Sequence, residues 1–114
     1  MNTHFMGLNS DALELIKVGT KTIEMRLYDE NRKQILKGDY IIFINTTNED
    51  DKLKVKVKEL YRYNNFEELY KKFDKIKLGY RENEVANYTD MEQYYSIENI
   101  KKYGVIGIEV EMIN

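Results

Sequence analysis

A strict alternation of lysine with aliphatic residues between positions 52 and 58 constrains the fold more than any other feature of the sequence. Leu53, Val55 and Val57 would share one side of an extended chain, and the other side would carry Lys52, Lys54, Lys56 and Lys58. Because successive side chains of a strand point to opposite faces, the alternation predicts a half-buried antiparallel strand with a basic outer face. Such a face either attracts phosphate groups or deters edge-to-edge pairing of sheets, and the sequence leaves both interpretations open.

Four further segments predict strands. Residues 40–44 are apolar on both faces and follow a Lys-Gly-Asp turn, which is typical of a central strand. Residues 20–27 and 106–112 alternate with period two, and residues 4–8 do so more weakly. The pattern therefore predicts a chain with at least five strands.

The spacing of these strands favours an antiparallel arrangement. The polar residues 46–51 are expected to form a hairpin loop between two strands. Leu60 follows Glu59 out of phase with the preceding alternation, which predicts a β-bulge before Tyr61. With helices between some of the strands, the fold class is α+β, with an antiparallel sheet or barrel rather than a doubly wound sheet.

Helix signals occur at four places. Asn9 or Ser10 is predicted to cap a helix over residues 11–18, which would end at Gly19 in the left-handed conformation. The other signals are a capping box of Asn65 with Glu68, a second of Thr89 with Glu92, and Ser96 at the start of a helix that ends at Gly104.

The composition excludes several classes of protein. The 114 residues, 42% hydrophobic and 33% charged, fit one folded domain over residues 1–114. No cysteine is present, so disulfide partners, thiolate metal sites and cysteine nucleophiles are excluded. The lone histidine, His4, is expected to serve packing, so we expect no metal and no cofactor. No apolar run approaches the ~20 residues of a membrane span and no secretory signal is recognisable, so we expect a cytoplasmic protein without membrane contact.

The charge distribution is more informative than the net charge of −2. Residues 52–77 carry nine basic and four acidic side chains, whereas both flanking segments are acidic. A basic middle segment can create a local face that attracts anions on an acidic molecule, although a solvated basic strand and helix would have the same composition.

Residues 19–26 combine the charged side chains that are most suited to a site. Glu24 and Arg26 fall on the same side of the predicted strand, about 7 Å apart along it. Lys21 stands at the entrance of that strand on the core side, where its ammonium group could meet an anionic or carbonyl group. On pattern alone, Glu24 and Arg26 form an ion pair on a solvated face, which contributes little to stability.

The same segment carries a family motif. Gly19, Lys21, Glu24 and Arg26 form the pattern Gly-x-Lys-x-x-Glu-x-Arg, and it precedes the Lys-Gly-Asp turn at residues 37–39. Together with the stretch at residues 91–108, this pattern resembles the ASCH domain, named from activating signal cointegrator homology, and in particular its small bacterial members. The resemblance covers residues 5–112.

The resemblance implies a PUA-like fold, a small antiparallel β-barrel flanked by helices, and the binding of RNA or a nucleotide-like small molecule in a cleft lined by the motif. Lys21 and Arg26 would contact phosphate or carbonyl oxygens of the ligand. Glu24 would orient these two cations or accept a hydrogen bond from the edge of a base. Tyr94 or Tyr95 would form a wall of the cleft, on which a base could stack.

An enzymatic alternative follows from the same resemblance. One bacterial branch of the family hydrolyses N4-acetylcytidine with a lysine and a threonine nucleophile, but Glu24 stands here where that branch has threonine. The alternative is therefore a small hydrolase of a modified nucleoside or RNA, with Lys21 as electrostatic stabiliser and Glu24 or Glu92 as the base. A module that binds a protein partner is a third possibility, for which no motif is present.

Overall fold

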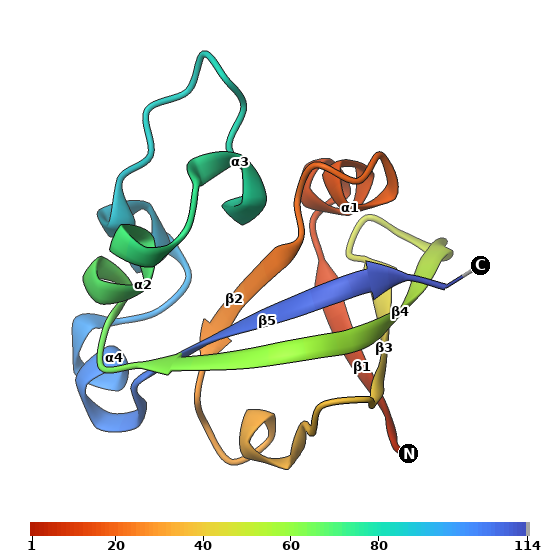
Figure 1. Cartoon of the computed structure of the whole chain (residues 1–114), viewed down its shortest axis with the longest axis horizontal. Helices are drawn as coiled ribbons and strands as arrows, with labels where there is room; N and C mark the ends of the chain where they lie inside the picture. Colours follow the sequence, from red (N-terminus) through yellow and green to blue (C-terminus); the bar gives the residue numbers. More distant parts are fainter. Residues whose placement is uncertain (114) are drawn as a thin grey trace.

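The computed structural model describes residues 1–113 and shows a five-stranded sheet curled into a half-barrel, with the helices of residues 66–103 gathered at one end and the N-terminal helix of residues 10–17 apart from them (Figure 1). The elements, in which η denotes a short 3₁₀ helix, are β1 (Thr3–Leu8), α1 (Ser10–Lys17), β2 (Ile23–Leu27), η1 (Arg32–Gln34), β3 (Tyr40–Asn45), β4 (Asn48–Tyr63), α2 (Phe66–Lys72), α3 (Lys75–Leu78), η2 (Tyr88–Gln93), α4 (Ile97–Tyr103) and β5 (Val105–Met112). Within the described residues, no helix has the length and apolar character needed to cross a membrane.

The strand order is β1-β3-β4-β5-β2, so the first two strands of the chain form the two ends of the sheet. The α+β class and the flanking helices are confirmed, but the expected antiparallel barrel is a mixed sheet that curls into a half-barrel. β1 pairs with β3 in parallel, and the other pairs are antiparallel. A parallel pair needs a long connection between its two strands, and here that connection is the whole of residues 9–39. The short spacings from which we predicted antiparallel pairing could not reveal this pair.

β4 is longer than the sequence pattern predicts. It begins at Asn48, so the expected loop over 46–51 shrinks to a turn at residues 46–47. The pairing with β3 shifts by several residues beyond Ile44, which leaves the polar residues 49–51 in an irregular part of the strand. The second irregularity falls at Lys58 rather than directly before Tyr61, and there the Glu59 carboxylate accepts a hydrogen bond from the Leu60 amide (3.1 Å).

The helix ends follow most of the predicted signals. Asn9 caps α1 by accepting from the Ala12 amide (2.8 Å), and the chain leaves α1 through Gly19 with a φ of 88°. The side chains of Asn65 and Ser96 cap α2 and α4 in the same way. The predicted box of Thr89 with Glu92 is wrong, because Asn87 caps this segment and the segment winds as a 3₁₀ helix. The four-residue helix α3 was not predicted, since it is too short to show a period.

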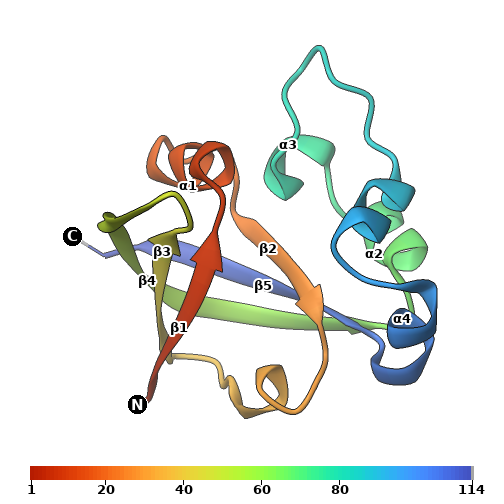
Figure 2. The ribbon, with the colours of Figure 1, turned by 180° about the vertical axis from the view of Figure 1, so that it is seen from behind.

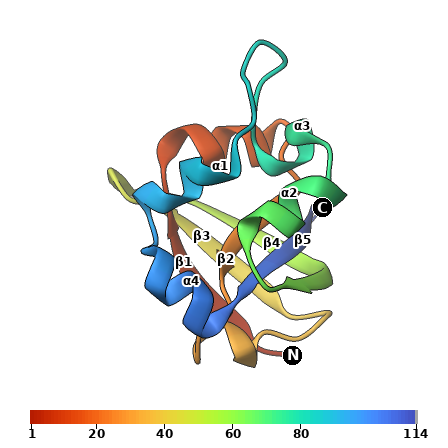
Figure 3. The ribbon, with the colours of Figure 1, turned by 90° about the vertical axis from the view of Figure 1, so that its left-hand side faces the viewer.

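Two hydrophobic cores lie on opposite faces of the sheet. In the interior of the half-barrel, α1 packs against β3 and β5 through a cluster that includes Leu13, Phe43 and Ile108. On the other face, α2 and α4 cover β2 and the start of β5 through a cluster that includes Leu69 and Val105 (Figure 3). β2 is therefore enclosed on both faces, although it is an end strand of the sheet.

Candidate functional site

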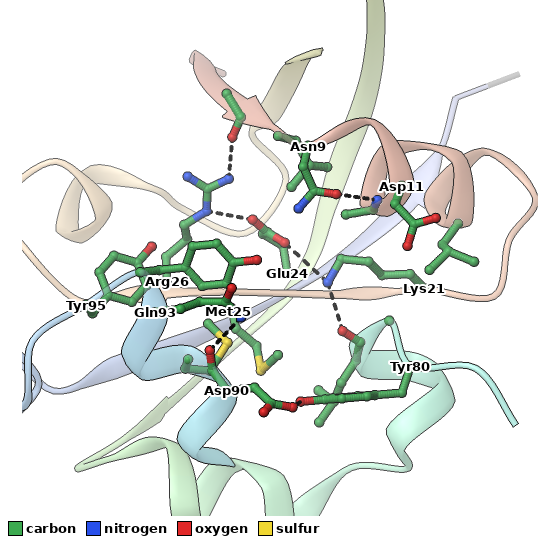
Figure 4. A pocket seen from close by; sticks show the side chains of 18 of the residues that line it. Asn9, Asp11, Lys21, Glu24, Met25, Arg26, Tyr80, Asp90, Gln93 and Tyr95 are labelled. Carbon is green, nitrogen blue, oxygen red and sulfur yellow. Dashed lines mark hydrogen bonds and ion pairs between the residues drawn. The ribbon is translucent and has the colours of Figure 1, made fainter. Parts of the chain in front are cut away.

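A cavity of about 520 Å³ opens along the end strand β2 (Figure 4). It is bounded by the last residues of β1, the start of α1, the segment after α3, and η2 with the two tyrosines that follow it. Each motif residue with a charged side chain lines it, namely Lys21, Glu24 and Arg26. The structure thus brings together the residues that the sequence placed on one strand.

The cavity occupies the seam between the two ends of the sheet. β1 and β2 lie beside one another here without a strand between them (Figure 2). Arg26 spans the seam, because its Nη2 donates to the carbonyl oxygen of Gly7 in β1 at 2.7 Å. A side chain, rather than a backbone ladder, therefore connects the strands at this point.

Glu24 lies at the centre of the charged group. Its carboxylate accepts a hydrogen bond from Arg26 Nε at 2.6 Å and pairs with Lys21 Nζ at 3.3 Å. Only 5% of its surface is exposed, so the expectation of a solvated ion pair is wrong. The reason is that Glu24 and Arg26 stand opposite Ile108 and Ile106 in the sheet, on the face that forms the interior of the half-barrel.

The cluster is ionised. Burial by itself would raise the pKa of Glu24, but the charges of Lys21 and Arg26 and hydrogen bonds from both lower it below its usual range. Burial by itself would lower the pKa of Arg26, and the Glu24 carboxylate raises it. The cavity thus contains a buried carboxylate that can only accept hydrogen bonds.

Lys21 is fully engaged with protein atoms. Its Nζ donates to the carbonyl oxygens of Ile23 (2.8 Å) and Leu78 (3.0 Å), and Glu24 is its third partner. A Cβ atom at Gly79, which has a φ of 106°, would stand 3.0 Å from the Lys21 side chain. Lys21 is therefore fit to hold Glu24 and to tie β2 to α3, rather than to reach a ligand itself.

Arg26 differs from Lys21 because part of its guanidinium group is unengaged. Nε and one N–H of Nη2 are used within the protein, and no acceptor among residues 1–113 is found for the remaining N–H groups. Its side chain is 12% exposed. Of the two motif cations, Arg26 is the one that can contact a ligand.

Tyr94 and Tyr95, the two tyrosines proposed from the sequence as a wall of the site, both line the cavity. Tyr94 is 59% exposed, so one face of its ring is available. Tyr95 is half-buried, because its ring stacks on Phe66 with 6.0 Å between centroids and 14° between planes. Burial raises the pKa of Tyr95, and it stands next to the Arg26 charge, which opposes that rise. The two tyrosine rings are 6.5 Å apart.

Glu92 does not join this group. It is exposed and does not line the cavity, whereas Asp90 and Gln93 from the same helix do. In a 3₁₀ helix side chains three positions apart share a face, so Asp90 and Gln93 point together and Glu92 points elsewhere. Sequence reasoning missed Asp90 and Gln93 because the apparent capping box of Thr89 with Glu92 predicted an α-helix instead of this 3₁₀ winding.

A hydroxyl network supports the wall of the cavity. Tyr80 donates to the Asp90 carboxylate at 2.7 Å, and its oxygen also lies 2.9 Å from the hydroxyl of Tyr70. Burial and these hydrogen bonds raise the pKa of Tyr80. The network fixes η2 against the segment after α3, and sequence reasoning did not identify it.

The other candidate residues lie elsewhere. His4 contacts Asp39 through its ring nitrogen (2.8 Å) and joins β1 to the turn before β3. The basic face of β4 does not line the cavity. In the part of the chain described here, no three His, Asp or Glu side chains are arranged to hold a metal ion.

Several solved structures have the same fold as this chain. The crystal structure of the hypothetical protein PH0355 is 41% identical, with a TM-score of 0.82 over 97% of this chain and 99% of that one. Protein PF0455 from Pyrococcus furiosus, solved by NMR, is 40% identical, with a TM-score of 0.68 over 96% of both chains. A mutant of ZmASCH from Zymomonas mobilis has a TM-score of 0.69 at 12% identity, over 96% of this chain and 68% of that one, and shows the fold alone.

No curated protein matches the chain. The model of the ASCH domain family matches residues 6–114, which include the motif, η2 and the final strand. The PUA-like fold expected from the motif is confirmed by these matches, with the half-barrel form described above. The chain therefore belongs to the ASCH domain family.

Proposed function

We propose that this protein binds RNA, or a nucleotide-like small molecule, in the cavity along β2. One observation carries the proposal, which is that a buried ionised carboxylate, a partly free guanidinium group and an exposed aromatic ring line the same cavity. They belong to Glu24, Arg26 and Tyr94. The cavity volume of about 520 Å³ suits a nucleotide-sized ligand.

The polar groups of the cavity match the edge of a nucleobase. Glu24 offers an acceptor and Arg26 offers donors, and they lie side by side because they hydrogen-bond to each other. A base edge, which presents donors and acceptors in a row, or a phosphate beside an amino group would satisfy both. Lys21 then acts as a positioning residue, because it holds the Glu24 carboxylate in place.

The aromatic wall supplies stacking. The exposed ring of Tyr94 offers a face to an unpaired base, whereas Tyr95 is already stacked on Phe66. Stacking of a base on an aromatic side chain contributes about 1–3 kcal/mol. We therefore assign base stacking to Tyr94 rather than to Tyr95.

The decisive experiment measures binding of fluorescent single-stranded RNA, hairpin RNA and single-stranded DNA to the wild type, Tyr94→Ala and Tyr88→Ala. Tyr88 is an exposed ring at the start of the same helix that does not line the cavity, so it is a matched control. We expect RNA to bind in a salt-dependent manner, and Tyr94→Ala to weaken binding by about 1–3 kcal/mol. Equal affinity of both variants with the wild type would refute the proposal.

The hydrolase alternative has less support. The lowered pKa of Glu24 makes its carboxylate a weak base, since a general base works best with a pKa near the working pH. Glu92, the other candidate base, lies outside the cavity lining. Release of acetate from acylated cytidine by the wild type, abolished in Glu24→Gln, would favour the hydrolase.

The cytoplasmic location, the bacterial origin and the extent of the single domain over residues 1–114 stay predictions.

A further inference from the structure

A second groove, of about 670 Å³, is lined by residues from the end of β4, the end of α4 and the segment after β2. We call it the Arg62 groove, and its characteristic residues are Tyr28, Arg62, Glu68, Lys101, Lys102 and Tyr103. It shares no lining residue with the cavity along β2. We infer that the Arg62 groove binds the phosphate backbone of single-stranded RNA, an inference that rests on the proposed function and extends it to a second site.

Arg62 is the unusual arginine of the chain. The other three arginines each contact a carboxylate, and these pairs are Arg26 with Glu24, Arg32 with Asp29, and Arg81 with Asp11. Within residues 1–113, no carboxylate lies within ion-pair distance of Arg62, and its guanidinium group instead lies over an aromatic ring. Arg62 is thus the arginine that forms no ion pair among the described residues.

Tyr28 holds this guanidinium group in place. The guanidinium carbon of Arg62 lies 4.0 Å from the centroid of the Tyr28 ring, which is the geometry of a cation–π contact. Such a contact occupies the flat face of the guanidinium and leaves its N–H edges directed outward. The planar edge of a guanidinium group matches two oxygens of a phosphate, so Arg62 is preorganised for a phosphodiester.

Two lysines from the last turn of α4 increase the positive charge of the groove. Lys101 and Lys102 are exposed, and in the described part of the chain neither has a carboxylate within ion-pair distance. Lys102 Nζ lies 5.1 Å from the centroid of the Tyr103 ring, so a second cation–aromatic pair faces the groove. Glu68 is the one acidic residue of the lining, which leaves an excess of cations.

The volume and the lining favour a strand over a free ion. A groove of about 670 Å³ exceeds the size of a single phosphate, and its tyrosines offer ring surface to bases beside the charges. The groove and the cavity are linked in sequence through β2, which lines the cavity and leads to Tyr28 of the groove. Tyr28 follows Arg26 by two residues. Its amide donates to the carbonyl oxygen of Gly104 (3.0 Å), which extends the pairing of β2 with β5 by one hydrogen bond. We expect one RNA strand to contact first Arg26 and then Arg62.

The test measures binding of fluorescein-labelled single-stranded RNA at several salt concentrations. The variant is Arg62→Ala/Lys102→Ala, and the control is Lys54→Ala. Lys54 is also an exposed cation over a tyrosine ring, 4.6 Å from the centroid of Tyr40, but it lies on the outer face of the sheet. We expect the double variant to bind at least ~10-fold more weakly with a salt slope reduced by about 1–2, and the control to match the wild type.

Further arms separate the possible ligands. Glu68→Gln removes the one negative charge of the groove and should strengthen RNA binding about twofold or more. Uridine monophosphate and inorganic phosphate, added as competitors, should displace the RNA only at concentrations far above its Kd. Displacement by inorganic phosphate near the Kd of the RNA would overturn the inference, because the groove would then be a site for small anions. Unchanged affinity and salt slope in the double variant would overturn it as well.

The outcome can be told apart from that of the proposed function. If Tyr94→Ala weakens RNA binding and Arg62→Ala/Lys102→Ala does not, the cavity binds RNA and the inference about the groove fails. If only the double variant weakens binding, the groove is supported and the proposed function of the cavity fails. Circular dichroism of each variant serves as the check that the exposed substitutions leave the fold intact.

Discussion

Arg26 Nη2 lies 2.7 Å from the carbonyl oxygen of Gly7, and the same guanidinium group donates through Nε to Glu24. The planar guanidinium group of Arg26 thus bonds to the backbone of β1 and to the buried carboxylate of Glu24 at the same time. A lysine at this position could make one of these contacts but not both, because its ammonium group is a single point of charge.

We therefore predict that Arg26→Lys lowers the free energy of unfolding by about 1–3 kcal/mol and weakens RNA binding by at least ~10-fold. Urea unfolding and fluorescence anisotropy measure the two effects. Arg32→Lys is the matched control, because Arg32 pairs with Asp29 near the surface (2.7 Å) and does not line the cavity. If Arg26→Lys behaved like this control, the guanidinium fork would have no special role.

Glu24→Gln should destabilise the protein by about 3–5 kcal/mol at neutral pH, because it leaves two buried cations without their counter-charge. Urea unfolding at neutral pH measures the loss. Glu92→Gln, an exposed change outside the cavity, should leave stability unchanged. A loss below ~1 kcal/mol in Glu24→Gln would contradict the ionised cluster described above.

The pH dependence of stability should identify the same carboxylate. The pKa of Glu24 is lower in the folded protein than its ordinary value of 4.5. Its stabilisation is therefore fully present above about pH 4.5 and is lost as the pH falls through the lowered pKa. The difference in stability between the wild type and Glu24→Gln should shrink on acidification below that value, as measured by urea unfolding. A difference that grew in acid would contradict the direction of this shift.

Gly79→Ala and Gly19→Ala form a matched pair. Both glycines have positive φ angles, 106° and 88°, so alanine at either should cost roughly 1 kcal/mol of stability. A Cβ at Gly79 would also meet the Lys21 side chain at 3.0 Å, whereas nothing lies within 4 Å of one at Gly19. We expect only Gly79→Ala to displace Lys21 and weaken RNA binding, which anisotropy would reveal. Equal binding by both variants would show that Lys21 does not position Glu24.

Tyr80→Phe should lower stability by about 1 kcal/mol, because its hydroxyl group joins Asp90 to Tyr70. Amide exchange in η2 should become faster, since this network holds η2 in place. Tyr88→Phe, at an exposed position of the same helix, should change neither property. Unchanged exchange in Tyr80→Phe would mean that packing alone fixes η2.

The sequence predicted the elements with strong periods and clear caps. The alternation over residues 52–58, the cap at Asn9 and the stop at Gly104 each depend on local chemistry, and each is found in the structure. The motif residues also meet in one cavity, because they lie on one strand and its entrance. What local patterns cannot show is which face of a strand is covered. Glu24 and Arg26 share a face as predicted, but β1 and α1 turn that face into an interior.

Other differences have the same origin in long-range contacts. The parallel pairing of β1 with β3 joins segments that are separated by the whole of residues 9–39, so no neighbouring spacing reveals it. The Arg62 groove collects Tyr28, Arg62 and Lys102 from three distant segments, and nothing in any one of them indicates the others. Because η2 winds as a 3₁₀ helix, Asp90 rather than Glu92 lines the cavity.

The seam between β1 and β2 is also where a closed barrel would place its last row of backbone hydrogen bonds. Closing that row would make the protein more stable, but it would fill the space along β2 that now forms the cavity. Under the proposed function, the half-barrel gives up part of its stability to keep a cavity for a ligand, and Arg26 restores part of the missing connection with a single side chain. Stabilised variants selected without a requirement for binding should therefore accumulate substitutions at this seam before any other place in the fold.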